Sequence, residues 1–211
     1  GCAESGKDIN EGGAEIGFVT VEGVTYATTV DSLLAIKYLV FDKKICTMQE
    51  LVQALRDNWV GHEKLQAIAL HKAPKYGRDD DEADTMAKQV MELWTGETWK
   101  YKTISTGRQF RPGMLSWNYW IAYSDILPAS PDGRAKGKFL SNALCPSNGA
   151  DTNGPTANAN SVGKALGGKA TDGQGDWEEY FNLLPNGGSH TITFNPSLLR
   201  DPEHKQKFKA Y

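Results

Sequence analysis

The sequence predicts an α/β protein. Helical patterns gather in the first half of the chain, whereas segments with strand patterns and long loops dominate from about Thr103 onward. With 211 residues, of which 39% are hydrophobic, the chain is long enough for one large domain or two small ones. In such an architecture, loops on a rigid scaffold carry the function.

The first strong pattern combines a strand with a helix. The stretch "EIGFVTVEGVTYATTV" (15–30) is rich in β-branched residues and is broken by Gly17 and Gly23, which indicates short strand and loop. Asp31 is expected to cap the helix "SLLAIKYLVF", whose apolar residues lie on nearly every side. This helix is therefore predicted to be buried.

Three further helices follow from caps and periodicity. Thr47 and Glu50 form a capping box, and a second helix is expected over 62–70. The triplet 79–81 opens a third helix, in which Met86, Val90, Leu93 and Trp94 recur at helical spacing. The three aspartates suggest a metal site, but no further ligand stands at suitable spacing; acids at a helix N-terminus are the favoured interpretation.

The second half is harder to interpret. The aromatic run "MLSWNYWIAY" contains Trp117, Tyr119 and Trp120, which suit either a core or a flat substrate. The stretch 126–168 is rich in glycine, proline and asparagine like a spacer, yet it carries Phe139, Leu140, Leu144 and Val162. The segment "GGSHTITFNPSLL" alternates His190, Ile192 and Phe194 with threonines, as in a half-buried strand.

Composition and spacing exclude several classes of function. A net charge of −3 favours neither a nucleic-acid nor a membrane-surface partner, and no apolar run approaches the ~20 residues of a membrane span. Three widely spaced cysteines indicate reduced thiols in a cytoplasmic protein. The four histidines lack partners in sequence, and each is expected to be a surface or hydrogen-bonded residue.

Two other motifs are rejected. The segment 163–170 approximates a phosphate-binding loop, but Ala170 replaces the hydroxyl residue that would hold Mg²⁺. The tetrapeptide "DTNG" (151–154) resembles the start of a calcium loop but lacks the later ligands, and is expected to be a turn.

Several longer segments, in order, resemble glycyl radical enzymes. They are "GGAEIGFVTVEGVTYATTVDSLLAIKYLVFD", "KAPKYGRDDDEAD", "ASPDGRAKGKFLSNALCPSNGADTNGPTANANSVGKA" and "GGSHTITF". The most specific pieces are Asp-Ser-Leu at 31–33, Pro-Asp-Gly-Arg at 131–134 and Gly-Pro-Thr-Ala at 154–157. The resemblance covers nearly the whole chain.

The resemblance implies a ten-stranded β/α barrel, of which this chain would hold an incomplete part. Residues 1–102 would be the C-terminal part of the pyruvate formate-lyase-like barrel domain, and residues 103–211 the N-terminal part of the glycine-radical domain. The stretch 126–168 would then be an ordered loop system at the barrel mouth. Its glycines and asparagines would allow tight turns close to the substrate.

The implied chemistry is radical and anaerobic. A separate radical-SAM activating enzyme would install a glycyl radical, which would oxidise a cysteine to a thiyl that attacks the substrate. The barrel would bind no metal or organic cofactor. The family's Arg-Val-x-Gly-Tyr motif does not occur before Tyr211, and Cys2 precedes Gly12 by only ten residues, too few for the thiyl loop.

Cys2 is therefore expected to be structural, and Cys46 and Cys145 are still weaker thiyl candidates. The thiyl cysteine is expected upstream and the radical glycine downstream, with no catalytic residue in this fragment. The fragment alone is expected to be inactive and poorly folded.

Within the family, the motifs look most like the arylacetate (4-hydroxyphenylacetate-type) decarboxylases, which implies cleavage of a C–C bond. The alternatives are a C–O or C–N lyase of the diol dehydratase or choline lyase type, an arylalkylsuccinate synthase and a formate acetyltransferase. A non-catalytic scaffold or binding protein built on the same barrel is the alternative from another class. Expected partners are the activating enzyme, a small-molecule substrate, further copies of the chain and a small accessory subunit.

The resemblance also places four residues near the substrate. Glu22, Glu15, Ile126 and Leu127 belong to the two segments that approach the cavity in the family. Glu22 stands in an apolar context, where burial would raise its pKa and make it a proton donor or acceptor. Ile126 and Leu127 would form an apolar wall.

Overall fold

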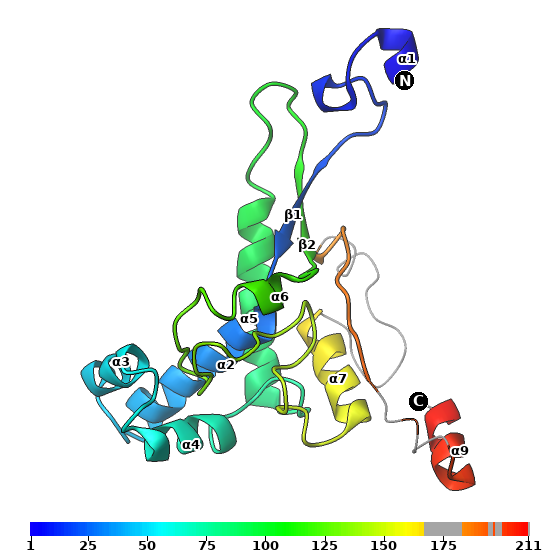
Figure 1. The fold of residues 1–211 in the computed structure, drawn as a ribbon. Helices are drawn as coiled ribbons and strands as arrows, with labels where there is room; N and C mark the ends of the chain where they lie inside the picture. The colour runs from blue at the N-terminus through cyan, green and yellow to red at the C-terminus, as the bar shows by residue number, and fades with distance from the viewer. Residues whose placement is uncertain (167–182, 194–195, 197–199, 211) are drawn as a thin grey trace.

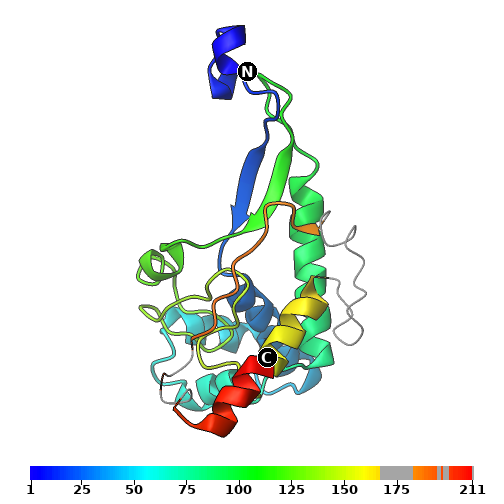
Figure 2. The ribbon, with the colours of Figure 1, turned by 90° about the vertical axis from the view of Figure 1, so that its right-hand side faces the viewer.

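The computed structural model describes residues 1–166, 183–193, 196 and 200–210. A short N-terminal helix lies at one end of the molecule, and the helices around α2, α3 and α4 lie at the other (Figures 1 and 2). No helix in the described ranges is both long and apolar enough to cross a membrane.

The elements, in chain order, are α1 (Cys2–Ser5), the 3₁₀ helix η1 (Ile9–Glu11), β1 (Val19–Gly23), α2 (Tyr26–Ile36), the π-helix η2 (Lys37–Asp42), α3 (Met48–Arg56), α4 (Glu63–His71), α5 (Asp81–Thr98), β2 (Phe110–Met114), α6 (Tyr119–Ala122), α7 (Pro155–Ala165) and α9 (Pro202–Ala210).

A parallel pair of strands forms the sheet. β1 and β2 pair in a register that sets Val19 opposite Phe110 and Glu22 opposite Gly113, and a single parallel bridge joins Met114 to Gly188 on the far side of β2. Parallel neighbours need a long crossover, and here the helices between the strands supply it. The described residues thus contain an α/β unit with a two-stranded sheet, and not the ten strands expected from the family resemblance.

Helix α2 begins earlier than predicted. It starts at Tyr26, after Thr25 adopts a left-handed conformation (φ 66°), so Asp31 lies inside the helix instead of capping it. The Asp31 carboxylate accepts the backbone N–H of Tyr76 at 2.9 Å. The expectation of burial on every side was also wrong, because Leu33 is 41% and Phe41 62% exposed.

The next three helices are confirmed. The hydroxyl of Thr47 accepts the N–H of Glu50, and the Glu50 carboxylate accepts the N–H of Thr47, as a capping box requires. Asp80 caps α5 by accepting the N–H of Ala83. Of the residues predicted to form the apolar stripe of α5, Met86, Val90 and Trp94 are partly buried, whereas Leu93 is 67% exposed. Met91, which was not in the predicted stripe, is fully buried.

Two apolar clusters hold these helices together. The first joins α2, α5 and α7 around Tyr26, Leu34 and Met91. The second joins the end of α2 to α3 and α4 around Trp59 and Leu51. Helix α5 belongs to the first cluster and also runs alongside the sheet in both views (Figures 1 and 2).

The long glycine-rich stretch is an ordered loop system as far as Leu166. Leu140, Leu144 and Val162 are buried in it, and Phe139 is 50% exposed. Residues 151–154 form the predicted turn, and the sequence of the rejected phosphate loop begins in the last turn of α7.

The strand expected over 188–194 is not formed. Beyond the bridge at Gly188, residues 189–193 have no regular secondary structure, and Phe194 lies outside the described residues. The segment is instead held by backbone hydrogen bonds of Ser189 to Met114 and to Leu144. Alternating apolar and polar residues are not enough to form a strand, because a strand also needs a neighbouring strand to pair with along its length.

Candidate functional site

The carboxyl ends of β1 and β2 lie at the same edge of the sheet. The parallel register sets Gly23, the last residue of β1, opposite Met114, the last residue of β2. In barrels and open sheets of parallel strands, ligands bind beyond this edge, where the loops after the strands meet. The residues at this edge are therefore the first to consider for function.

The two faces of the strand pair differ. On one face, a Cβ added at Gly23 would lie 2.7 Å from the Met114 sulfur and 3.3 Å from the Trp94 ring of α5. Helix α5 therefore covers this face. Because side chains alternate along a strand, Glu22 points to the opposite face. In a β/α barrel, the face turned away from the helices lines the interior.

Glu22 lies over Gly113 on that opposite face. A Cβ added at Gly113 would come 2.7 Å from Cδ of Glu22, so the carboxyl group occupies the space that any larger residue would need. The Glu22 Oε2 atom is buried and has no hydrogen-bond partner among the described residues. Burial raises the pKa of Glu22, and a hydrogen bond from the Leu115 backbone opposes that rise in part. A partly buried carboxyl group with a raised pKa at this edge of the sheet is a candidate for proton transfer.

Arg111 stands on the same face as Glu22. It lies opposite Thr20 in the register, two residues before the Glu22–Gly113 pair along each strand, and residues two apart in a strand point to the same face. Its guanidinium carbon lies 4.3 Å from the centroid of the Phe18 ring, and its Nε atom is buried without a partner in the described part of the chain. Sequence reasoning missed this residue, because only the register shows that it shares a face with Glu22.

The other predicted site residues lie apart from this pair in the chain. Glu15 is exposed and precedes the amino end of β1, whereas Glu22 stands near its carboxyl end. Ile126 and Leu127 are 69% and 39% exposed and follow α6 in the loop after β2. Whether these residues touch substrate stays a prediction.

The aromatic run before that loop is not core. Trp117 and Tyr119 are 64% and 46% exposed, and their rings meet edge to face at 6.2 Å. Tyr119 also stacks on Tyr123 at 5.2 Å. These rings, like Ile126 and Leu127, are exposed apolar groups in the part of the chain that follows β2.

The three cysteines are free and partly buried. Burial raises the pKa of the thiols of Cys46 and Cys145, which keeps both in the unreactive protonated form. Cys2 lies in α1, where its sulfur would be 2.9 Å from a Cβ added at Gly13. Its structural role stays a prediction.

A second polar cluster lines a cavity of about 510 Å³ between α2, α4 and two loops. Its charged members are almost fully buried: Asp31, Lys75, Asp132 and Arg134. The ammonium group of Lys75 donates to the Asp132 carbonyl at 2.8 Å. Burial raises the pKa of Asp31 to about 6 and lowers that of Lys75.

This cluster has a structural role. The Arg134 side chain donates to the Ser130 hydroxyl and to the carbonyls of Pro128, Ala135 and Lys138, which closes the loop 128–138 around it. Lys75 and Asp31 then tie this loop to the chain around Tyr76 and to α2. The cluster therefore fixes the loop that begins just after Ile126 and Leu127.

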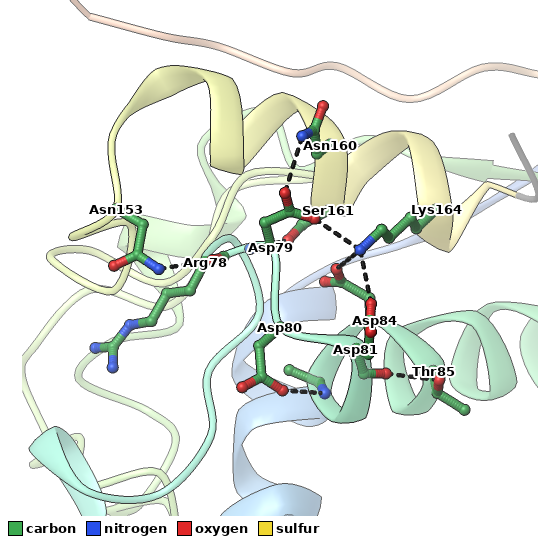
Figure 3. A network of polar contacts seen from close by, with 11 residues as sticks. Arg78, Asp79, Asp80, Asp81, Asp84, Thr85, Asn153, Asn160, Ser161 and Lys164 are labelled. Carbon is green, nitrogen blue, oxygen red and sulfur yellow. Dashed lines mark hydrogen bonds and ion pairs between the residues drawn. The ribbon is translucent and has the colours of Figure 1, made fainter. Parts of the chain in front are cut away.

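The acidic residues before α5 form an ion-pair network (Figure 3). Lys164 of α7 lies 2.7 Å from Asp79, 2.8 Å from Asp81 and 3.6 Å from Asp84. A lysine ammonium thus occupies the place between the carboxylates, and Asp80 caps the helix. The helix N-terminus interpretation of the triplet is confirmed by these contacts.

Comparison with known proteins places this geometry in context. The family model described as "Pyruvate formate lyase-like" matches residues 1–124. The chain is 40% identical over 163 residues to trans-4-hydroxy-L-proline dehydratase of Clostridioides difficile, which covers 77% of this chain and 20% of that protein. It is also 40% identical over 177 residues to (2S)-3-sulfopropanediol dehydratase of Klebsiella oxytoca, covering 82% of this chain and 21% of that protein.

A solved structure agrees with these relatives. The B12-independent glycerol dehydratase from Clostridium butyricum, in its glycerol-bound form, superposes with a TM-score of 0.83 at 33% identity, over 99% of this chain and 25% of that chain. The chain therefore spans about a fifth to a quarter of the length of these relatives.

The similarity to decarboxylases is weaker than the motifs suggested. The 4-hydroxyphenylacetate decarboxylase glycyl radical subunit of Clostridioides difficile is 27% identical over 176 residues, covering 72% of this chain and 19% of that protein. The family model covers more than half of the 211 residues, and the fold agrees over nearly the whole chain. The chain belongs to the pyruvate formate lyase-like family.

Proposed function

We propose that the full-length protein is a glycyl radical lyase that breaks a C–O bond and eliminates water from a small hydroxylated substrate. The similarity to two dehydratases at 40% identity and to a glycerol dehydratase structure supports this assignment. The dehydratase thus replaces the arylacetate decarboxylase as the favoured branch, since the decarboxylase subunit is only 27% identical.

The observation that carries the proposal is Glu22 at the carboxyl end of β1. Elimination of water requires a proton for the departing hydroxyl group, and burial favours the protonated form of Glu22, which would supply it. Glu22 donates this proton as the C–O bond breaks. Ile126 and Leu127, in the loop after β2, would contribute an apolar wall to the substrate cavity of the full-length protein, and Glu15, before β1, is kept as a further candidate for substrate contact.

The radical chemistry belongs to parts of the protein outside this chain. A radical-SAM activating enzyme installs the glycyl radical, and no metal or organic cofactor is needed in the barrel. The full-length protein assembles as a homo-oligomer, with or without a small accessory subunit. A non-catalytic scaffold built on the same barrel would show no radical after treatment with the activating enzyme.

The test uses the full-length protein with its activating enzyme under anaerobic conditions. An organic radical signal split by one α-hydrogen is expected, followed by backbone cleavage on exposure to air. Glu22→Gln should lower kcat/KM for dehydration by about two orders of magnitude, with the radical content unchanged, and Glu22→Asp should retain more activity.

The products decide between the branches. Release of water and an unsaturated or carbonyl product supports the dehydratase, whereas release of CO2 from an arylacetate would restore the decarboxylase. Unchanged turnover of Glu22→Gln would remove Glu22 from the site.

A further inference from the structure

We propose that Arg111 binds a negatively charged group of the substrate, which makes the substrate a hydroxylated organic anion instead of a neutral diol. The proposal rests on the lyase function above and adds the chemical class of its substrate. The anionic group is a carboxylate or a sulfonate, since both present paired oxygen atoms to a guanidinium.

The register places Arg111 on the face that carries Glu22. Residues 20 and 22 of β1 stand opposite residues 111 and 113 of β2, so all four project from the same face. The opposite face, which carries Gly23 and Met114, is covered by Trp94 of α5. Arg111 and Glu22 therefore both turn away from the helical layer, toward the side that lines the interior in a β/α barrel.

The guanidinium has no anionic partner in the described part of the chain. No ion pair to Arg111 is formed there, although surface lysines and Lys164 find carboxylates. Its Nε atom is buried and makes no hydrogen bond among the described residues. A buried N–H of a charged group without an acceptor is costly, and a bound anion would remove that cost.

Its neighbours hold the side chain without using its hydrogen-bond donors. The guanidinium packs on the Phe18 ring at 4.3 Å, a cation–π contact that orients the plane and leaves the N–H edge free. Asn186 donates to the Arg111 carbonyl at 2.6 Å and so anchors the backbone. Among the described residues, none occupies the hydrogen-bond donors of the guanidinium.

The spacing suits a short substrate with two functional groups. Arg111 and Gly113 are two residues apart, about 6.6 Å along a parallel strand, and the Glu22 carboxyl group lies over Gly113. A molecule of three to five carbons can then present a hydroxyl group to Glu22 and an anion to Arg111. The sulfopropanediol and hydroxyproline dehydratases act on compounds that carry such an anion, whereas glycerol does not.

The first experiment measures binding to the full-length protein without activation. Calorimetry compares 2,3-dihydroxypropane-1-sulfonate, a hydroxycarboxylate of similar length, and glycerol. The anions should bind more tightly than glycerol, and Arg111→Gln should weaken them by about 10- to 100-fold, the range of a lost charge-assisted hydrogen bond. The carboxylate and sulfonate arms show which anion is preferred.

The second experiment repeats the comparison in the activated enzyme. Arg111→Gln should raise KM for the anions while leaving kcat/KM for a neutral diol within about threefold, and Arg111→Lys should rescue part of the loss. Arg56→Gln, at an exposed position in α3, is the matched control and should change neither.

Three outcomes would overturn the proposal. If glycerol binds as tightly as the anions and Arg111→Gln changes neither, the substrate is not recognised by its charge at Arg111. If the variant lowers the melting temperature and weakens all ligands equally, Arg111 pairs with another part of the protein and is structural. Water elimination from neutral diols alone would refute this proposal but leave the lyase function standing, whereas failure to form a radical would refute the lyase function.

Discussion

A glycine gives Glu22 its environment. The carboxyl group of Glu22 fills the space over Gly113, where an added Cβ would come within 2.7 Å of Cδ. Gly113 is not needed for its backbone conformation, since it is absent from the described glycines with positive φ. Its role is to leave room, which lets a carboxyl group lie partly buried against the sheet with a raised pKa.

Gly113→Ala should therefore displace Glu22 and lower kcat/KM in the activated full-length enzyme by about tenfold or more. The alkaline limb of the pH–rate profile, where Glu22 loses the proton that it donates, should move to lower pH, because a carboxyl group returned to solvent regains an ordinary pKa. Gly96→Ala is the control, since a Cβ at that position in α5 meets nothing within 4 Å. A Gly113→Ala enzyme with wild-type rate and profile would show that Glu22 needs no such space.

Asp31 should make the stability depend on pH. Its pKa rises from 3.8 to about 6 in the folded state, so the folded state binds more protons than the unfolded state between these values. Its burial therefore leaves the protein more stable below pH 4 than above pH 6, by at most about 3 kcal/mol. Asp31→Asn, which keeps an oxygen for the Tyr76 N–H, should remove this dependence.

The difference in unfolding free energy between Asp31→Asn and wild type, measured by urea at several pH values, isolates this effect from the other carboxylates. It should favour the variant above pH 6 and vanish near pH 4. A difference that does not change with pH would show that Asp31 titrates normally.

Helices α5 and α7 are joined by charge as well as by apolar contacts. Asp84 is 2% exposed, and no hydrogen bond of ordinary geometry reaches its oxygen atoms from the described residues. Burial raises the pKa of Asp84, and the nearby Ser161 hydroxyl and the Lys164 ammonium, 3.6 Å away, oppose that rise. The same lysine reaches Asp79 and Asp81, so one side chain balances three carboxylates at the start of α5 (Figure 3).

Lys164→Met should destabilise the full-length protein by about 1–3 kcal/mol, because it leaves Asp84 buried without a counter-charge. This expected loss of stability is smaller than for a fully buried ion pair, because the Lys164 side chain is 31% exposed and solvent screens its charge. Adding Asp84→Asn should recover part of it in a double-mutant cycle by urea denaturation. Additive effects of the two changes would indicate that the charges do not interact.

The capping box of α3 offers a local test. Thr47→Ala removes the acceptor for the Glu50 N–H and should cost about 1 kcal/mol. Amide hydrogen exchange should accelerate in the first turn of α3 while that of α5 stays unchanged. Equal exchange in both proteins would mean that the apolar cluster around Trp59 alone holds the helix.

Over the whole molecule, the described chain leaves large apolar side chains exposed before β1 and in the loop after β2. Ile16 is 79%, Trp117 64% and Ile126 69% exposed. Single exposed apolar residues are ordinary, but grouped ones mark surfaces that bind something. The relatives are about four times as long as this chain, and their remaining parts are expected to cover these residues.

The 211 residues produced alone should therefore bind a hydrophobic dye and aggregate, whereas the full-length protein should not. Dye fluorescence and light scattering on both samples provide the measurement. A monodisperse 211-residue protein with a cooperative thermal transition would show that this part folds independently.

The sequence alone determined the features that depend on neighbours in the chain. The capping box at Thr47, the acidic start of α5, the turn at 151–154 and the family motifs all arise from local spacing, and all were predicted. Local reasoning failed where a distant partner decides. Asp31 looked like a cap, yet it lies within a helix, where one of its oxygen atoms accepts the Tyr76 N–H and the buried Lys75 supplies a favourable charge.

Only the tertiary structure showed which residues share a face. Glu22 was singled out from its apolar context, but its contact with Gly113 and the presence of Arg111 beside it depend on pairing between strands 86 residues and more apart in the chain. A shift of one residue in that register would turn every side chain of β2 to the other face. Local sequence carries no record of such a register, because the register is set by contacts between two strands that lie far apart in the chain.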